Sequence, residues 1–294
     1  MYSVRRDTHG DMAPKVIGLI GMPLAHSASP IFQQAALDHC GIDARYEPWE
    51  TEVEELPVAV DRMREEDCLG ANVTIPHKER IIGLLDGIDS LARRIGAVNT
   101  VVNRSGRLWG HNTDILGFGQ ALRRDGDFDP RGRDALVLGA GGAARAVAVA
   151  LIDGGAASLT VTDIDEKRLQ GLLRDLAGLG QIVLRGVAPD SVELAAAASA
   201  CQLLINCTPI GMRHSPAEND TPIPPELISP GVLVFDLVAN PLETRLLAEA
   251  RRRGARTVSG VTMLVYQGAE SFRLWTGVEP PLDVMLYTAR SALA

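Results

Sequence analysis

Short apolar runs, each followed by turn-forming residues, recur along the first third of the chain. Such runs are typical of buried strands. They predict strands at residues 16–21, 46–49, 71–74 and 97–103. Amphipathic stretches from about Leu56 and from Lys78 predict helices between these strands. Ser29-Pro30 predicts another helix, with the serine as N-cap and the proline at its first position. Strands that alternate with helices indicate one α/β domain.

A second series of apolar runs begins at residue 134. A strand at 134–138, a helix through Leu151 and a strand at 159–162 make a βαβ unit. The pattern continues with further strands at 182–186, 203–206 and 232–237. We therefore expect a doubly wound parallel sheet. After Gly260 the chain reads as helix to its end, because apolar residues recur at helical spacing.

The stretch at 194–212 carries no charged residue, but it does not predict a membrane span. Gln202, Asn206 and Pro209 interrupt it, and a bilayer tolerates such residues only at a high free-energy cost. We expect a buried helix followed by a buried strand. The N-terminal segment contains two arginines without an apolar run behind them, so no secretory signal is predicted.

Composition narrows the function classes. A chain of 294 residues with 46% hydrophobic content is long enough for two packed domains. A formal net charge of -8 disfavours nucleic acid as a partner, so a small molecule is the expected ligand. The spacing of Cys40, Cys68, Cys201 and Cys207 fits neither a CxxC pair nor a metal cluster. Reduced thiols and a cytoplasmic location are expected.

A glycine-rich fingerprint, GxGxxA, follows the strand at 134–138 and opens the next helix. Glycines allow the backbone to approach a pyrophosphate, whose charge is met by free N–H groups of the helix start. An ordinary glycine-rich turn is the alternative. The candidate cofactor-binding residues of this loop are Gly139, Ala140, Gly141, Gly142 and Ala143.

The choice between NAD and NADP depends on Asp163, which ends the following strand. A carboxylate at that position accepts hydrogen bonds from both adenine-ribose hydroxyls and repels a 2′-phosphate. Ile164 stands where an arginine would bind that phosphate, although Lys167 and Arg168 follow closely. NAD is therefore preferred and NADP disfavoured. The alternative is that Asp163 only caps a helix.

Small polar residues cluster at the ends of the predicted strands of the first domain. The clusters lie at 26–30, 70–79, 96–100 and 110–114. Strand ends face the crevice of an open α/β sheet, so these groups can converge on a polyhydroxylated acid. Singly, each has a structural alternative, such as a helix cap for Ser27, Ser29 or Asp114 and a turn for Asn72 or Asn99.

Taken together, these motifs resemble the shikimate dehydrogenase and quinate/shikimate dehydrogenase family. The resemblance rests on several motifs in order along nearly the whole chain: GLIGMPLAHSASP, GANVTIPHKE, GAVNT, GHNTD, LVLGAGGAARAV, LINCTPIGM and GVTMLVYQGAESFRLWTG. It implies a two-domain α/β fold. A substrate-binding domain with a mainly parallel sheet would occupy 1–113 and a Rossmann-like NAD-binding domain 114–259. The C-terminal helices at 260–294 would pack back on the first domain.

The resemblance also implies a reaction, the interconversion of 3-dehydroshikimate and shikimate with NAD. Lys78 and Asp114 would form the catalytic pair. The remaining implied contacts are Ser27 and Ser29 at the substrate carboxylate, Thr74, Asn99 and Gln267 around its ring, and Leu237 and Gly260 beside the nicotinamide. A carboxylate beside Lys78 favours its charged form, which suits proton donation to a ketone.

Three alternatives stay open on the sequence. A quinate-preferring catabolic dehydrogenase is one, because Ala239 stands where the family often carries a tyrosine near the substrate carboxylate. More distant readings are a methylenetetrahydrofolate dehydrogenase and a catalytically silent nucleotide sensor. His26, His77 and His111 lack further ligands at a recognisable spacing, so no metal site is predicted. A monomer or a homodimer is expected.

Overall fold

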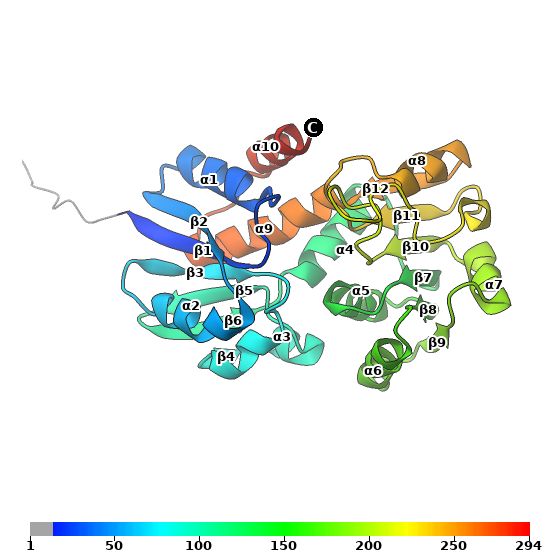
Figure 1. The fold of residues 1–294 in the computed structure, drawn as a ribbon, viewed down its shortest axis with the longest axis horizontal. Coiled ribbons are helices and arrows are strands. Elements are labelled where there is room, and N and C mark those ends of the chain that lie inside the picture. The colour runs from blue at the N-terminus through cyan, green and yellow to red at the C-terminus, as the bar shows by residue number, and fades with distance from the viewer. Residues whose placement is uncertain (1–13) are drawn as a thin grey trace, which may run out of the picture.

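Two six-stranded sheets stand next to each other in the computed structural model, which describes residues 14–294. Strands β1 to β6 build one half of the molecule and β7 to β12 the other (Figure 1). The expectation about a secretory signal concerns a segment that lies mostly outside the described residues. Within the described part, no helix is long and apolar enough to cross a membrane.

The first sheet has the strand order β2-β1-β3-β5-β6-β4. Its strands are β1 (Lys15–Gly21), β2 (Ala44–Glu50), β3 (Cys68–Val73), β4 (Gly87–Ile88), β5 (Thr100–Arg104) and β6 (Arg107–His111). The pairs β1–β2, β1–β3 and β4–β6 are parallel, whereas β5 runs antiparallel to β3 and β6. The predicted strand at 97–103 is thus three residues early, and its hairpin partner β6 was not predicted. The tight turn between them has both Ser105 and Gly106 at positive φ.

The helices of this half are α1 (Ser29–His39), α2 (Leu56–Arg62) and α3 (Ser90–Ile95), with short 3₁₀ turns at Val53–Glu55 and Arg80–Leu84. The expected helix from Lys78 is therefore wrong, since only a single tight turn forms there. Ser29 is not the N-cap of α1: Ala28 occupies that position, and the Ser27 hydroxyl accepts the Ser29 N–H at 3.3 Å. Pro30 does lie in the first turn, as predicted.

The second sheet is parallel throughout and confirms the doubly wound prediction, with the order β12-β11-β10-β7-β8-β9. Its strands are β7 (Asp134–Leu138), β8 (Ser158–Thr162), β9 (Val183–Val187), β10 (Leu203–Asn206), β11 (Leu233–Asp236) and β12 (Arg256–Ser259). Its helices are α5 (Gly142–Asp153), α6 (Glu166–Leu176), α7 (Val192–Ala200) and α8 (Arg245–Arg252), with a 3₁₀ turn at Pro225–Leu227. Strand β12 was not predicted. The expected buried helix, α7, buries only Leu194 and Ala198, whereas β10 is buried throughout.

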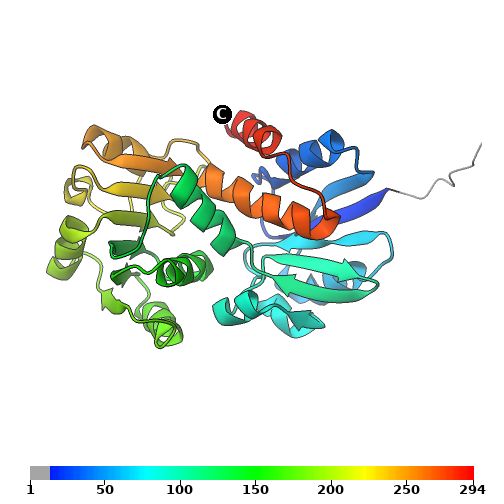
Figure 2. The same ribbon diagram turned by 180° about the vertical axis from the view of Figure 1, so that it is seen from behind.

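Two helices join the halves. Helix α4 (Asp114–Arg124) and helix α9 (Gly260–Thr276) pack against each other, and Figure 2 shows them, in green and orange, side by side between the sheets. A Cβ at Gly117 would lie 2.7 Å from the Cβ of Gln267, so glycine permits this close approach. Along α9, Val265 packs in the core of the first half and Tyr266 in the core of the second.

The chain returns to its first domain at its end. Gly277, in the left-handed conformation, ends α9, and α10 (Leu282–Leu293) then packs against α1. Met285 and Ala289 of α10 share a core with Phe32 and Leu37. The two-domain α/β fold with a C-terminal helix on the first domain is confirmed, although the helix is interrupted rather than continuous from Gly260.

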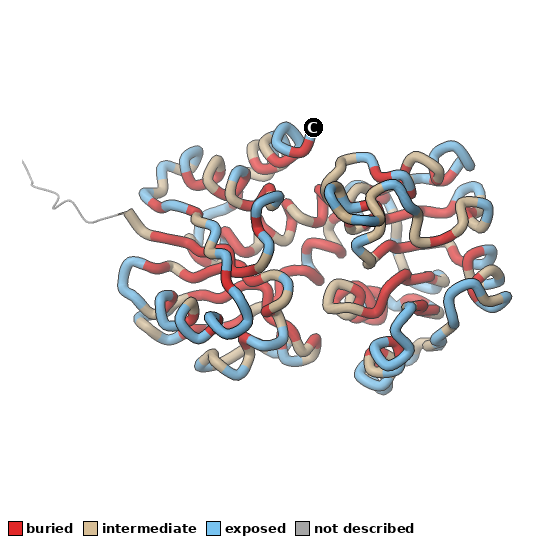
Figure 3. The backbone as a smooth tube through the Cα atoms, in the orientation of Figure 1, coloured by how far each residue is buried: buried red, intermediate tan, exposed pale blue. Residues whose placement is uncertain are grey.

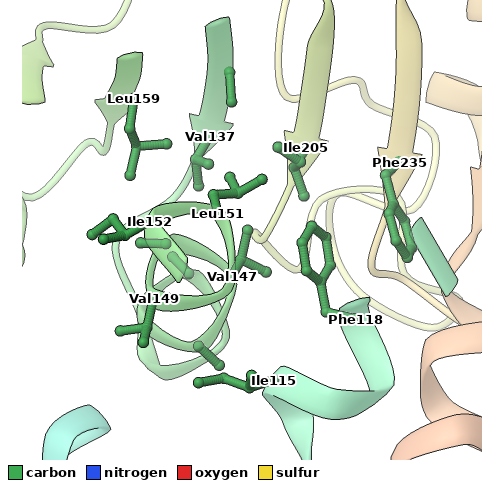
Figure 4. Close-up of a cluster of buried hydrophobic side chains, with 14 of the residues drawn as sticks. Ile115, Phe118, Val137, Val147, Val149, Leu151, Ile152, Leu159, Ile205 and Phe235 are labelled. Atoms are coloured by element: carbon green, nitrogen blue, oxygen red, sulfur yellow. The ribbon is translucent and has the colours of Figure 1, made fainter. Parts of the chain in front are cut away.

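The central strands of each sheet are buried, whereas the outer strands β2 and β9 are more exposed (Figure 3). In the second half, Phe118 of α4 stacks on Phe235 of β11 with ring centroids 5.2 Å apart. Val137, Ile205 and Leu151 close this cluster (Figure 4). Burying such side chains stabilises the fold by roughly 1.5–3 kcal/mol each, and it fixes α4, which carries Asp114, against the second sheet.

Candidate functional site

A cavity of about 230 Å³ opens between the two halves, at the carboxyl ends of β1 and β3. A second cavity of about 580 Å³ adjoins it, since Thr74, Lys78 and Ala143 line both. The first brings together residues from both halves that the sequence singled out: Ser27, Ser29, Thr74, Lys78, Asn99, Asp114, Ala143, Leu237, Gly260 and Gln267. The second adds Gly139, Ala140, Gly141, Gly142 and Asp163. Every candidate site residue therefore faces one continuous cleft.

A close ion pair lies where the two cavities meet. The Lys78 Nζ is 2.7 Å from Asp114 Oδ2, and the side chains are 22% and 8% exposed. Lys78 follows β3, and its carbonyl accepts the Val98 N–H at 2.8 Å, which fixes the backbone there. The other carboxylate oxygen, Asp114 Oδ1, accepts a hydrogen bond from Asn99 Nδ2 at 2.9 Å. The pair is thus held from both sides, with a charged donor facing the cavity.

Asp114 is the first residue of α4 rather than its cap. Thr113 occupies the N-cap position, and the Asp114 N–H donates to Asn112 Oδ1 at 3.0 Å. A carboxylate in the first turn is stabilised by the helix dipole. Its side chain is therefore free to bind Lys78 and Asn99, which removes the alternative of a simple helix cap.

The far end of the smaller cavity carries hydroxyl and amide groups. Ser27 and Ser29 stand in the loop and first turn that lead into α1, and Gln267 comes from α9. The Gln267 Nε2 donates to the Leu264 carbonyl at 2.8 Å, while its Oε1 accepts from Asn99 at 3.1 Å. These neutral groups suit a hydroxylated ring that bears an acid.

Asn72 also lines this cavity. The sequence placed it in the polar cluster at 70–79, with a turn as the alternative, but assigned it no contact. It lies in β3, and the Tyr46 hydroxyl donates to its Oδ1 at 2.8 Å. Residues two apart on a strand share a face, so the spacing of Asn72 and Thr74 contained the missing signal. Ala239 lines the same cavity, close to Leu237 in the chain.

The glycine loop between β7 and α5 forms the floor of the larger cavity. Gly139 has a φ of +97°, which favours glycine, and no atom lies within 4 Å of where a Cβ of Gly141 or Gly142 would be. Helix α5 starts there without a side-chain cap, so its first N–H groups face the cleft. This open cradle at a helix N-terminus fits the pyrophosphate of a dinucleotide.

Gly260 and Leu237 approach each other closely in the smaller cavity. A Cβ on Gly260 would fall 2.3 Å from the Leu237 carbonyl oxygen, so glycine permits this approach.

Asp163 braces the glycine loop rather than a helix. Its Oδ2 accepts the Ala140 N–H at 2.7 Å and its Oδ1 the Asp165 N–H at 2.8 Å, and only 6% of the side chain is exposed. Asp165 is the residue that caps α6. The alternative of Asp163 as a helix cap is therefore wrong. Ile164 is 93% exposed at the same edge.

Arg168 is the basic residue of α6 that reaches this edge. It lines the larger cavity, and its guanidinium lies 3.8 Å from Asp163 Oδ2 and 3.6 Å from Asp165 Oδ2. Lys167 is not among the residues that line either cavity. The guanidinium of Arg168 is thus already engaged by two carboxylates.

The described histidines and cysteines form neither a metal site nor a disulfide. His77 is fully buried with its Nε2 2.7 Å from the Thr51 carbonyl, and His111 pairs with Asp89 at 2.7 Å. His26 stacks on His214 with ring centroids 4.4 Å apart. Residues 14–294 contain no group of three potential ligands that would hold a metal ion. All four cysteines are free, and burial raises the pKa of Cys68 to about 11.

Two family models match segments of this chain. The family model described as "Shikimate dehydrogenase substrate binding domain" matches residues 19–101, and "Shikimate 5'-dehydrogenase C-terminal domain" matches residues 260–290. A relative from Moorella thermoacetica named shikimate dehydrogenase (NADP(+)) is 45% identical over 282 residues, which cover 95% of this chain and 93% of the relative. The chain belongs to the shikimate dehydrogenase family.

Solved structures support the same assignment. The shikimate 5-dehydrogenase of Thermus thermophilus in complex with NADP(H) and shikimate superposes with a TM-score of 0.84 at 39% identity, over 95% of this chain and 100% of that one. The quinate dehydrogenase of Corynebacterium glutamicum in complex with NAD gives 0.86 at 33% identity, over 95% and 99%. The similar structures thus include a shikimate dehydrogenase with NADP(H) and a quinate dehydrogenase with NAD.

Proposed function

We propose that the chain interconverts 3-dehydroshikimate and shikimate with NAD, and that Lys78 and Asp114 carry the proton. The observation that carries this proposal is the 2.7 Å Lys78–Asp114 pair at the junction of a cavity lined by hydroxyl and amide groups and a larger cavity lined by the glycine loop. Related proteins named shikimate dehydrogenase support the same substrate.

The pair performs the proton step. A nicotinamide held beside Leu237 and Gly260 would supply the hydride to the carbonyl carbon in the reduction and would accept it from the carbinol carbon in the oxidation. During ketone reduction the Lys78 ammonium donates a proton to the carbonyl oxygen as that oxygen becomes an alkoxide. The Asp114 carboxylate keeps the ammonium aimed at the cavity, and Asn99 holds the carboxylate in place. In the oxidation direction the neutral amine takes the hydroxyl proton back.

The other lining groups bind the acid. Ser27 and Ser29 donate to its carboxylate, at the end of the cavity opposite the glycine loop. Thr74, Asn99 and Gln267 bind the ring and its hydroxyls. Hydroxyl and amide groups suit this task because they can donate hydrogen bonds to the carboxylate and to the ring hydroxyls. A charged side chain placed against the neutral ring would be left without a partner.

The cofactor half binds NAD in preference to NADP. The glycine loop holds the pyrophosphate, while Leu237 and Gly260 border the nicotinamide. At the adenosine end Asp163 and Asp165 repel a 2′-phosphate, Ile164 offers it no hydrogen bond, and Arg168 is engaged by both carboxylates. The relative from Moorella thermoacetica is named for NADP(+), whereas the quinate dehydrogenase structure contains NAD. The residues of this chain favour NAD.

Quinate is the second candidate substrate, and one observation favours it. Ala239 lines the substrate cavity, and a methyl group there leaves more room than a larger side chain. The quinate dehydrogenase relative also covers nearly the whole chain. Quinate carries one more ring hydroxyl than shikimate, so extra room near the acid would admit it.

The proposal also includes the domain boundaries, the cellular location and the oligomeric state. The substrate domain ends at 113, where β6 has finished and α4 begins, and the cofactor domain ends at 259, before α9. The C-terminal helices form the third segment. A cytoplasmic location and a monomeric or homodimeric state stay predictions.

Steady-state kinetics with both acids and both cofactors tests the proposal. We expect the highest kcat/KM for shikimate with NAD. No turnover of either acid would overturn the reaction, and an equal or higher value with NADP would overturn the cofactor assignment. Lys78→Ala, prepared in the same way, controls for contaminating host enzyme.

A further inference from the structure

Two buried hydroxyls, Thr100 Oγ1 and Ser271 Oγ, meet 2.8 Å apart behind the substrate cavity. Thr100 begins β5 and Ser271 lies in α9, and each is 0% exposed. Neither lines the cavity, so neither touches a ligand bound there. A pair of polar groups this deep in the protein stabilises the fold no better than an apolar pair of the same shape, provided that nothing is left unpaired.

One side of this hydroxyl pair binds Asn72. The Asn72 Nδ2 lies 3.2 Å from Thr100 Oγ1 and 3.1 Å from Ser271 Oγ, and it also donates to the Asn99 carbonyl at 3.1 Å. The Tyr46 hydroxyl holds the Asn72 Oδ1 from behind. Asn72 is therefore fixed with its amide group toward the hydroxyl pair.

The other side of the hydroxyl pair fixes the orientation of the Asn99 side-chain amide. Thr100 Oγ1 donates to Asn99 Oδ1 at 3.0 Å, and the Thr113 N–H donates to the same oxygen at 2.8 Å. With its oxygen held by two donors, the Asn99 amide must point its Nδ2 the other way. That nitrogen donates to Asp114 Oδ1 at 2.9 Å and to Gln267 Oε1 at 3.1 Å.

The reversed amide would be costly at this place. The Asn99 side-chain oxygen would then face the Asp114 carboxylate and the Gln267 side-chain oxygen Oε1, and the Asn99 side-chain nitrogen would face the Thr113 N–H. Ser271 limits this exchange because it donates its one hydroxyl proton to Thr100 Oγ1, which leaves the Thr100 proton for Asn99 Oδ1. The Ser271 Oγ also lies 3.2 Å from Thr113 Oγ1 and 3.0 Å from the Gln267 backbone carbonyl oxygen. The network thus joins β3, β5, α4 and α9 at the point where the two halves meet.

We propose that the Thr100–Ser271 hydroxyl pair is a positioning device that sets the Asn99 amide and, through it, the orientation of Asp114 toward Lys78. The inference rests on the proposed role of Lys78 and Asp114. Thr100 and Ser271 are positioning residues and act through Asn99. A misplaced catalytic group lowers the rate more than it lowers binding, since a small error in geometry weakens the proton step first.

The test uses variants that change the hydroxyl and little else. Thr100→Val keeps the shape and removes the donor, Thr100→Ser keeps the donor, and Ser271→Ala removes the partner. The control is Thr276→Val on the same helix, whose hydroxyl also bonds a carbonyl four residues earlier, at 2.8 Å from Phe272 O. We expect kcat about tenfold lower in Thr100→Val and Ser271→Ala, with the Kd of NAD unchanged, and near-normal kcat in Thr100→Ser and Thr276→Val.

Two results separate positioning from packing. The double variant Thr100→Val, Ser271→Ala should be no worse than the worse single variant, because both act through one hydrogen-bonded pair. Fully additive losses would overturn the inference. So would an equal kcat loss in Thr100→Ser, or an unchanged kcat in Thr100→Val with a normal melting temperature.

A readout without turnover keeps the inference distinct from the proposed function. In protein labelled with ¹⁵N-asparagine, the Asn99 side-chain amide should exchange its hydrogens at least about tenfold faster in Thr100→Val than in the wild type or Thr276→Val. Unchanged exchange overturns the inference even if the enzyme is active. Wild-type protein that turns over neither acid overturns the proposed function, whatever the exchange shows.

Discussion

The substrate side of the cleft is built from side chains, whereas the cofactor side is built mostly from backbone. On the substrate side, Lys78, Asn99 and Gln267 come from three separate segments and are joined by hydrogen bonds. On the cofactor side, the glycine loop offers N–H groups and empty space, and the Asp163 carboxylate serves to brace the loop. A ring with several hydroxyls needs distinct donors and acceptors, whereas a pyrophosphate needs amides and room.

The two sides also use buried carboxylates differently. Asp114 pairs with Lys78 and lines the cavity. Asp236, in β11, is 0% exposed, and no cation among residues 14–294 pairs with it. The Thr244 hydroxyl, the Asn206 amide and the Val238 N–H hold it at 2.5, 2.9 and 3.0 Å. The contrast teaches that burial of a carboxylate does not by itself mark a catalytic group. Substitutions on the two sides should therefore fail in different ways.

The largest effect is expected for Lys78→Ala on the substrate side. Loss of the proton donor should lower kcat by ~10²–10⁴ while the Kd of NAD stays nearly constant. Stopped-flow and steady-state kinetics measure both values. Lys78→Arg keeps the charge but is a poor proton donor, so it should be nearly as slow; an arginine variant with wild-type kcat would show that charge alone suffices.

The second prediction concerns Asp236 and pH. Burial raises its pKa from 3.8 to about 6, so between these values the folded protein holds a proton that the unfolded chain has released. Its contribution to stability is therefore highest below about pH 4 and falls as the pH rises toward 6, by about 3 kcal/mol in all.

Urea unfolding of Asp236→Asn and wild type at several pH values checks this sign. The amide cannot ionise, so the stability of the variant relative to wild type should increase from pH 4 to pH 6 and then level off. A difference that does not change with pH would mean that Asp236 is not protonated in the folded protein. The substrate-side pair should be unaffected, so kcat serves as the control.

The third prediction is a cofactor preference of at least ~10²-fold in kcat/KM for NAD over NADP. The double variant Asp163→Asn, Ile164→Arg should move the preference toward NADP, because it removes a negative charge and adds a bidentate donor. Asparagine can still accept the Ala140 N–H, so the loop stays braced. Equal wild-type values for both cofactors at fixed shikimate would contradict the proposed position of Asp163.

The smallest effect is expected for Gly141→Val. Its side chain meets no protein atom within 4 Å and projects into the space proposed for the cofactor. The Kd of NAD should rise about tenfold, because the added side chain would collide with the ligand. The melting temperature should stay unchanged, because the side chain meets no protein atom. Gly132→Val, a glycine that also meets no atom but at a φ of +68°, should instead lower stability and leave the Kd unchanged. An intact Kd in Gly141→Val would place the cofactor elsewhere.

Local signals predicted much of this fold. The strand at 134–138, the glycine loop and the βαβ unit came from apolar runs and glycine spacing, and the structure has them within a few residues. The errors fall where local signals are weak. The helix expected from Lys78 is a 3₁₀ turn. Strand β6 was missed because its residues RLWGH alternate weakly, and its partners are β5, across the Ser105-Gly106 turn, and the distant β4.

For the site, the sequence by itself determined which chemical groups are present and in what order, because strand ends and glycine loops are encoded by neighbouring residues. Only the tertiary structure decided which groups meet. Asn72 bonds Ser271 and Asn99 bonds Gln267 across 199 and 168 residues, and Asp163 bonds a loop amide 23 residues earlier. The first two pairings depend on how helix α9 crosses between the two sheets, and that crossing is set by packing around Gly117 and the two cores rather than by any local pattern. The third depends on the pairing of β7 with β8.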